Sequence, residues 1–188
     1  MDRRAFLTKA GLTTALTATG LEGLAGVAWA QDRRINFHFL SFSANTAGTP
    51  DLVAMSGDGH VATGGVVGSG SFVHLDPSTG VPATILGEGT WKAKRLVSFH
   101  EEGRWGVFLS GTVVMDIRLV PEGSAPVPAQ LTMNCNLGPA GISTGLPEGF
   151  FLDIPSLGAE FQPTTFPGGF PFGLTVFTTV VEERGSSG

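Results

Sequence analysis

The chain has 188 residues, 41% of them hydrophobic, and a formal net charge of −5. An acidic balance of this kind argues against nucleic acid or an anionic membrane surface as a partner. The single cysteine, Cys135, cannot form an internal disulfide, so stability must come from a hydrophobic core or from a bound ligand or partner.

The N-terminal segment has the three parts of an export signal. A basic head with Arg3, Arg4 and Lys9 precedes an apolar stretch that ends on the small-x-small sequence Ala28-Trp29-Ala30. The arginine pair followed by x-Phe-Leu-x-Lys resembles the twin-arginine (Tat) signal family of bacteria, although that family more often has Ser or Thr in place of Asp2. The resemblance covers residues 1–30. It implies export of an already folded protein by the Tat translocase to the periplasm or the exterior.

The apolar stretch, residues 10–30, is also long enough to span a bilayer. Its four glycines, its threonines and Glu22 make it weakly apolar for a membrane anchor, so we expect its removal as a signal. Removal leaves residues 31–188 as a single domain, which is large enough for a hydrophobic core. Subtracting the segment's three basic and two acidic residues from the 11 and 16 of the whole chain leaves a net charge of −6.

The remaining sequence is typical of an all-β domain. Glycine and proline interrupt every long window, no stretch sustains a helical apolar pattern, and Val, Phe and Thr are plentiful. Turns are predicted at Ser56-Gly57-Asp58-Gly59, Asp76-Pro77-Ser78-Thr79-Gly80 and Glu101-Glu102-Gly103-Arg104. Strands are predicted at about 34–43, 51–56, 60–67, 70–76, 84–99, 105–120, 130–137, 149–154 and 173–182.

The segment from Trp91 to Leu119 has the alternation of one long hairpin. With Phe99 opposite Trp105, an apolar face forms that also contains Arg95 and pairs it with Leu109. On this register Leu96 and Phe108 lie together on the outer face, where a loop or a second subunit could cover them. We therefore expect an inward-pointing Arg95 and a possible homo-oligomer contact through Leu96 and Phe108.

Long strands with internal glycines favour a single small antiparallel β-barrel, with a β-sandwich as the alternative. Eight-stranded small-molecule binders and dirigent- or cyclase-like barrels are similar in these generic respects, but no motif places the chain among them. The Pro-, Gly- and Phe-rich segment 138–173 is predicted to be a long loop. It would be either a lid over a binding site or a loop whose phenylalanines complete the core.

An arginine on an inward face requires either an acidic partner, such as Asp153 or Glu160, or an anionic or carbonyl ligand. An arginine beside an aromatic loop suggests a pocket with one polar fixing group. The predicted ligand-binding residues are Arg95, Trp91, Phe166 and Phe170.

Histidines supply the weak catalytic candidates. His74 shares a strand face with Asp76, and a carboxylate two positions away can orient an imidazole for base chemistry. His60 follows a predicted turn. No spacing brings together the three or four ligands of a zinc or copper site, so we expect no metal and no cofactor. Cys135 lies on an apolar strand face and is expected to serve packing.

Three functions are compatible with these patterns. The leading hypothesis is an exported barrel that binds a small apolar or weakly anionic ligand. The second is a cofactor-independent cyclase or isomerase that uses the barrel lumen. The third is a structural or surface-assembly protein with a packed interior.

Overall fold

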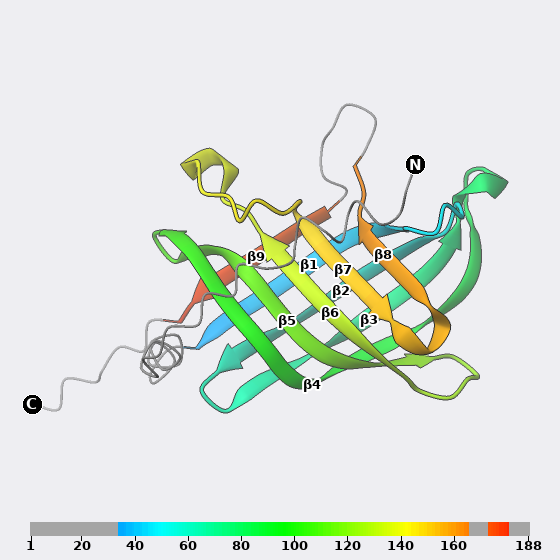
Figure 1. Ribbon diagram of the computed structural model, residues 1–188, viewed down its shortest axis with the longest axis horizontal. Helices are drawn as coiled ribbons and strands as arrows, with labels where there is room; N and C mark the ends of the chain where they lie inside the picture. The colour runs from blue at the N-terminus through cyan, green and yellow to red at the C-terminus, as the bar shows by residue number, and fades with distance from the viewer. Residues whose placement is uncertain (1–33, 166–172, 181–188) are drawn as a thin grey trace, which may run out of the picture.

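The computed structural model describes residues 34–165 and 173–180, and this part of the chain is all-β (Figure 1). Within it there are nine strands, three short 3-10 turns and no α-helix. None of its helical turns is long and apolar enough to cross a membrane. The 3-10 turns are η3 (Pro77–Thr79), η4 (Gly138–Ala140) and η5 (Pro155–Leu157). The strands are β1 (Ile35–Asn45), β2 (Leu52–Ala62), β3 (Gly65–Asp76), β4 (Thr84–Trp105), β5 (Phe108–Pro121), β6 (Val127–Cys135), β7 (Gly149–Ile154), β8 (Ala159–Pro163) and β9 (Gly173–Thr179).

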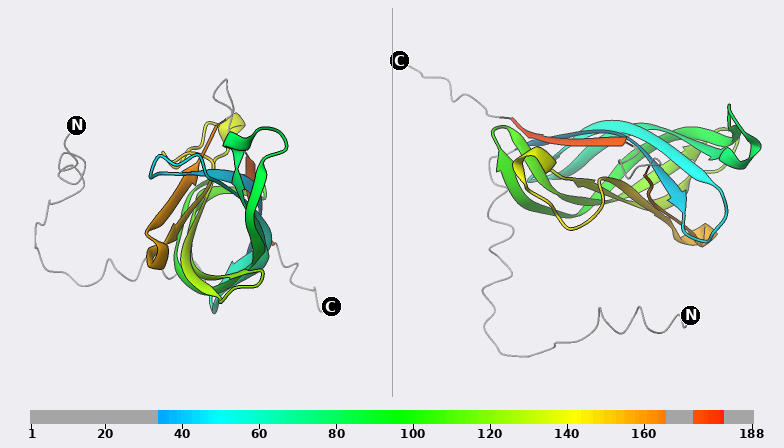
Figure 2. Two further views of the ribbon diagram at one scale, coloured as in Figure 1. Left: turned by 90° about the vertical axis from the view of Figure 1, so that its right-hand side faces the viewer. Right: turned by 90° about the horizontal axis from the view of Figure 1, so that it is seen from above.

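The strands form one antiparallel sheet that closes on itself. Consecutive strands pair from β1 to β8, and β8 returns to β1 at residues 43–45. The left view of Figure 2 shows the strands arranged around a common centre. The prediction of a single small antiparallel β-barrel is confirmed, in preference to the sandwich.

The last strand, β9, shares one edge of β1 with β8. Residues 35–41 of β1 pair with β9, and residues 43–45 pair with β8. β9 also pairs with the first two residues of β5. One end of the barrel is therefore closed by β9 between β1 and β5, whereas β6, β7 and β8 close the other end.

The inward side chains of the strands meet in one hydrophobic core. Phe39 lies at its centre, with ring centroids 5.8 Å from Trp91 and 6.0 Å from Phe150. Side chains in such cores interdigitate at the density of organic crystals. The largest fully buried side chains are Trp91, Phe37, Phe150, Phe177, Met55, Leu109, Met115, Ile117, Leu131, Met133, Leu152 and Val113.

Glycines let aromatic rings lie directly against the wall formed by β2 and β3. Gly57 pairs with Gly70, and a Cβ on Gly57 would lie 2.3 Å from the Trp91 ring. The neighbouring pair, Gly59 and Gly68, is covered in the same way by the Phe37 ring. Aromatic side chains that cover strand glycines restore packing that the missing side chains cannot provide.

The predicted turn at residues 56–59 is therefore wrong, because these residues form the middle of β2. The turn between β2 and β3 lies at Thr63 and Gly64 instead. Glycine-dense sequence marks a close approach of rings to backbone here, and not a change of chain direction. The turn predicted at residues 76–80 is confirmed: it contains η3, and the Asp76 carboxylate accepts a hydrogen bond from the Ser78 backbone N–H at 2.9 Å.

The β4–β5 hairpin exists, but its predicted register is wrong. Trp105 pairs with Phe108, so the turn consists of Gly106 and Val107, and Gly106 has a φ of 62°. Such a positive φ favours glycine. Residues 101–104, predicted as the turn, belong to β4.

Three bulges interrupt β4, between Ala93 and Arg95, between Leu96 and Ser98, and between Glu101 and Gly103. A bulge places two residues opposite one and so changes which side chains face the core. Leu96 therefore packs against the core, and Phe99 does so through Phe177, with ring centroids 6.4 Å apart. Phe108 is exposed, so Leu96 and Phe108 do not lie together on one outer surface.

The segment 138–173 is not one continuous loop. It contains β7, β8, η4 and η5, and the predicted strand at 149–154 matches β7. β8 had no predicted counterpart, because its five residues, Ala-Glu-Phe-Gln-Pro, offer only one large apolar side chain.

Candidate functional site

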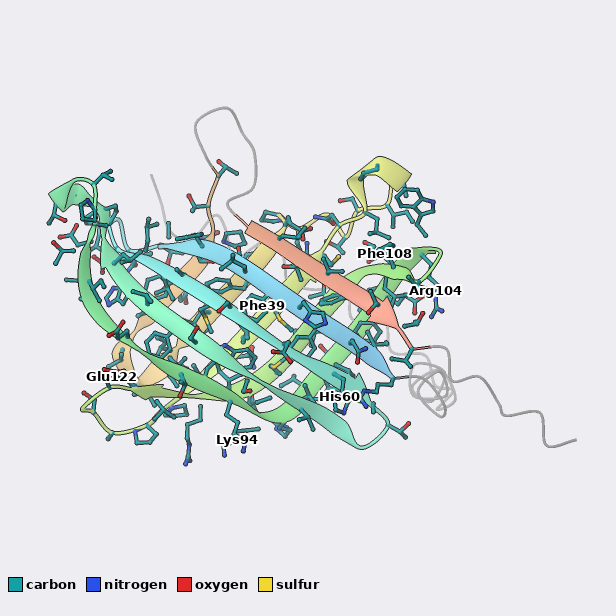
Figure 3. The ribbon with its side chains drawn as sticks, turned by 180° about the vertical axis from the view of Figure 1, so that it is seen from behind. Phe39, His60, Lys94, Arg104, Phe108 and Glu122 are labelled. Atoms are coloured by element: carbon teal, nitrogen blue, oxygen red, sulfur yellow. The ribbon has the colours of Figure 1, made fainter. Side chains whose placement is uncertain are left out.

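An open groove of about 920 Å³ lies on the outer face of β9, β1, β2 and β3. Figure 3 faces this side of the barrel. Two rows of paired residues cross the groove, and each row begins with an apolar side chain on β9 and ends with polar side chains. The first row is Leu174, Leu40, Ser56, Ser71 and Thr90, and the second is Val176, His38 and Asp58.

The apolar end of the groove is formed by β9 and β1. Leu40 and Leu174 are directly paired and are 58% and 63% exposed. Phe42 and Val176 line the groove beside them. A contiguous set of exposed apolar side chains is a common mark of a binding surface.

The polar end of the groove is formed by β2, β3 and the adjoining part of β4. The hydroxyl oxygens of Ser56 and Ser71 lie 3.1 Å apart and share a hydrogen bond. His38 lies opposite Asp58 one row further along. These groups offer both hydrogen-bond donors and acceptors, and they place a basic side chain beside an acidic one.

Trp91, a predicted ligand-binding residue, does point inward as expected. It is fully buried, and its indole N–H donates a hydrogen bond to the Ser56 carbonyl oxygen at 2.9 Å. Its ring thus fills the interior beneath the groove. Phe166 and Phe170, the other two aromatic candidates, lie outside the described residues.

The inward position predicted for Arg95 is wrong. The bulge after Ala93 places its side chain on the outer face, where the Arg95 Nη2 atom lies 2.6 Å from the Asp116 carboxylate. The Arg95 Nε atom donates to the same oxygen at 2.8 Å. This hydrogen bond holds the pKa of the Asp116 carboxyl below its usual value. The partners proposed for an inward Arg95, Asp153 and Glu160, lie opposite each other on β7 and β8.

The structure separates the three weak catalytic candidates. His74 lies 3.5 Å from the carboxylate of Asp51, a residue that is not among the sequence-predicted candidates, and the His74 ring packs edge-on against Phe161. Asp76 instead accepts hydrogen bonds from the backbone and side chain of Ser78. His60 lies within β2, and its Nδ1 atom is 3.1 Å from the Arg34 guanidinium.

A carboxylate that sequence reasoning did not single out, Glu148, connects two strands that do not pair there. One of its oxygens accepts the backbone N–H of Asn136 at 2.6 Å, just after β6, and the other accepts that of Thr175 in β9 at 2.9 Å. Burial raises the pKa of Glu148, and the two N–H groups act in the opposite direction. Because each oxygen already accepts a backbone N–H, this carboxylate links the end of β6 to β9 and has a structural role.

Metal binding finds no support in the described ranges, because no group of three or more His, Cys, Asp or Glu side chains there is arranged to hold an ion. Cys135 is buried in the core, and burial together with the nearby Glu148 raises the pKa of its thiol to about 11. Such a thiol is rarely ionised at neutral pH and is a poor nucleophile.

The groove residues could have been found from the strand predicted at 34–43. Phe37 and Phe39 form its inward face, so the opposite face contains Asn36, His38, Leu40 and Phe42. Large apolar residues beside a histidine on this outward face could have indicated a binding surface. The contributions of β2, β3 and β9 depend on strand order, which alternation within one strand does not reveal.

Comparisons with known proteins leave the site to be judged on its own geometry. A scan against protein-family models, a search of curated proteins and a search of solved structures each found no match to this chain.

Proposed function

We propose that this chain is an exported binding protein for a small amphipathic molecule, and that the molecule lies in the groove across β9, β1, β2 and β3. The observation that carries the proposal is the gradient along the row from Leu174 and Leu40 to Ser56 and Ser71. A volume of about 920 Å³ lies within the range of small-molecule sites. The twin-arginine resemblance of residues 1–30 supports the export part of the proposal.

The lining indicates the chemical class of the ligand. Its apolar body would lie on the leucine pair and displace water from both side chains. Its polar group would reach the hydroxyls of Ser56 and Ser71 and the side chains of His38 and Asp58. His38 is basic and Asp58 is acidic, so together they favour neither a strong anion nor a strong cation. A hydrogen-bonding head such as a hydroxyl, a carbonyl or a weakly anionic group therefore fits better.

The lumen alternatives have less support. Cyclase or isomerase chemistry inside the barrel would need an open cavity with a titratable group. The described interior is instead occupied by large side chains such as Trp91, Phe39 and Phe150. A purely structural role does not by itself account for the exposed pair of Leu40 and Leu174 beside the hydroxyls of the groove.

Binding of an uncharged fluorescent dye with an apolar ring system and a carbonyl group, Nile red, tests the site. We expect the Leu40→Ser, Leu174→Ser double variant to weaken dye binding about tenfold or more, because two apolar contacts are lost. Native mass spectrometry of protein purified from its exported compartment would reveal a retained natural ligand.

Val67→Ser is the matched control. Val67 is 62% exposed, like the two leucines, but it does not line the groove. Its substitution should leave the dye affinity unchanged. Equal loss in both proteins, or unchanged affinity in the leucine variant, would contradict a ligand site in the groove.

A further inference from the structure

The β4–β5 hairpin ends in an exposed apolar tip. Trp105 is 58% exposed, and Val107 and Phe108 beside it are also exposed. The two-residue turn at Gly106 and Val107 brings these side chains together at one end of the barrel, where Figure 3 shows Phe108. Removing three such side chains from water is favourable, so their exposure favours a partner that covers them.

Two acidic side chains next to this tip each lie beside a basic one. The Arg104 guanidinium contacts the Glu101 carboxylate, with Nη2 2.6 Å from Oε2. On the same strand, His100 Nε2 lies 3.2 Å from a Glu102 oxygen. Paired charges at the base of an apolar tip lower the electrostatic cost of bringing that tip into a medium of low dielectric constant.

The chain enters the barrel at the same end. The Thr179 N–H donates to the Val107 carbonyl oxygen at 2.9 Å, and Thr179 pairs with Ile35, the first residue of β1. In the sequence, the apolar stretch 10–30 ends only four residues before Arg34. Four residues span at most about 14 Å. Whenever that stretch occupies a bilayer, during export or as an anchor, Arg34 must therefore lie close to the bilayer surface.

We propose that the tip formed by Trp105, Val107 and Phe108 inserts into the interfacial layer of a phospholipid membrane. Tryptophan is suited to this layer, because its ring is apolar and its indole N–H can bond to headgroups or water. The net charge of −6 without residues 1–30 opposes anionic lipid, so insertion is driven by apolar contact with uncharged lipid. This inference is independent of the groove.

Quenching of Trp105 by vesicles of brominated phosphatidylcholine tests the proposal. The spectrum of the protein as purified after export, minus that of its Trp105→Phe variant, isolates the Trp105 emission, because the emission of the buried Trp91 cancels. We expect this difference signal to be quenched by the brominated lipid and to weaken when phosphatidylglycerol replaces part of the phosphatidylcholine. An unquenched difference signal would overturn the proposal.

Vesicle flotation of the protein as purified after export provides the second measurement. Trp105→Ala should reduce vesicle partitioning about tenfold, whereas Ile85→Ala should not. Ile85 is a matched control, since it is 57% exposed at the opposite end of the same strand. Equal partitioning of the two variants would show that the membrane is not the partner. The same conclusion would follow if sedimentation found a lipid-free dimer that the Trp105→Ala substitution dissociates.

Discussion

At the scale of single residues, the glycines of β2 and β3 determine how closely the barrel wall approaches its core. Gly57 lies against the Trp91 ring, and its missing Cβ is the space that the ring occupies. Trp91 in turn donates its indole hydrogen bond to the Ser56 carbonyl in the same wall. These two contacts fix the Trp91 ring against the wall beneath the groove.

Gly57→Ala should destabilise the protein by roughly 1–3 kcal/mol, the usual cost of overpacking a core. The added methyl would meet both the Trp91 ring and the Ser69 carbonyl oxygen. Urea unfolding followed by circular dichroism measures the loss. Gly64→Ala serves as the control, because a Cβ there has no atom within 4 Å, and its effect should stay within about 0.5 kcal/mol. Similar losses in both variants would contradict this account of Gly57.

Single residues also explain where sequence reasoning failed. Unbroken alternation from Trp91 to Phe99 predicts an inward Arg95, and one bulge after Ala93 reverses that orientation. Asp51 was not considered as a partner for His74, because the two residues meet only through pairing of β2 with β3. Alternation within one strand indicates the face of a residue but not its cross-strand neighbours.

At the scale of strands, the Glu148 carboxylate replaces backbone pairing between the end of β6 and β9. Its two oxygens each hold one backbone N–H that has no strand partner on that side. Sequence reasoning could not assign this role, because the acid lies in an irregular connection between β6 and β7.

The raised pKa of Glu148 predicts a pH-dependent stability. A carboxyl whose pKa is higher in the folded state contributes stability that is present below its unfolded pKa, near 4.3, and is lost as pH rises through its folded pKa. The stability of wild type relative to Glu148→Gln should therefore be greatest near about pH 4 and shrink as the pH is raised above that value.

Urea unfolding of both proteins across this pH range measures the effect. The exposed residue Glu88 supplies the control variant, Glu88→Gln, whose difference from wild type should not follow the same course. A difference between wild type and Glu148→Gln that grows with pH would show that the carboxylate form is the stabilised one.

Strand content and fold class were predictable because alternation and composition are local properties. The β1, β5 and β7 regions match their predicted strands closely. The predicted strand at 60–67 instead spans the end of β2, a turn and the start of β3. Glycines that serve packing and glycines that serve turns look the same in a sequence, and this ambiguity produced the error.

At the scale of the whole molecule, the sheet of the described residues closes into a barrel and leaves no open edge through which solvent could reach the core. Cys135 is the natural reporter, because it is buried at the end of β6, where that strand pairs with Gly111 of β5. Its thiol pKa of about 11 further reduces its reactivity. Labelling of Cys135 by a disulfide reagent at about pH 8 should therefore follow global unfolding.

The opening free energy from the labelling rate should equal the free energy of unfolding from urea titration. The wild-type protein in denaturant, where the thiol is freely exposed, gives the reference rate. Labelling that is much faster than this equality allows would reveal a partial opening beside β6.

The pairing of β1 with β9 also has a consequence for the order of events during synthesis. Ile35, at the start of the first strand, meets its partner Thr179 only after the 144 positions that separate them (179 − 35) have been synthesised. Contacts so distant in sequence make closure a late and comparatively slow step. Closure of the barrel therefore has to follow the synthesis of β9, and a twin-arginine signal would suit this order, since that route carries proteins that are already folded.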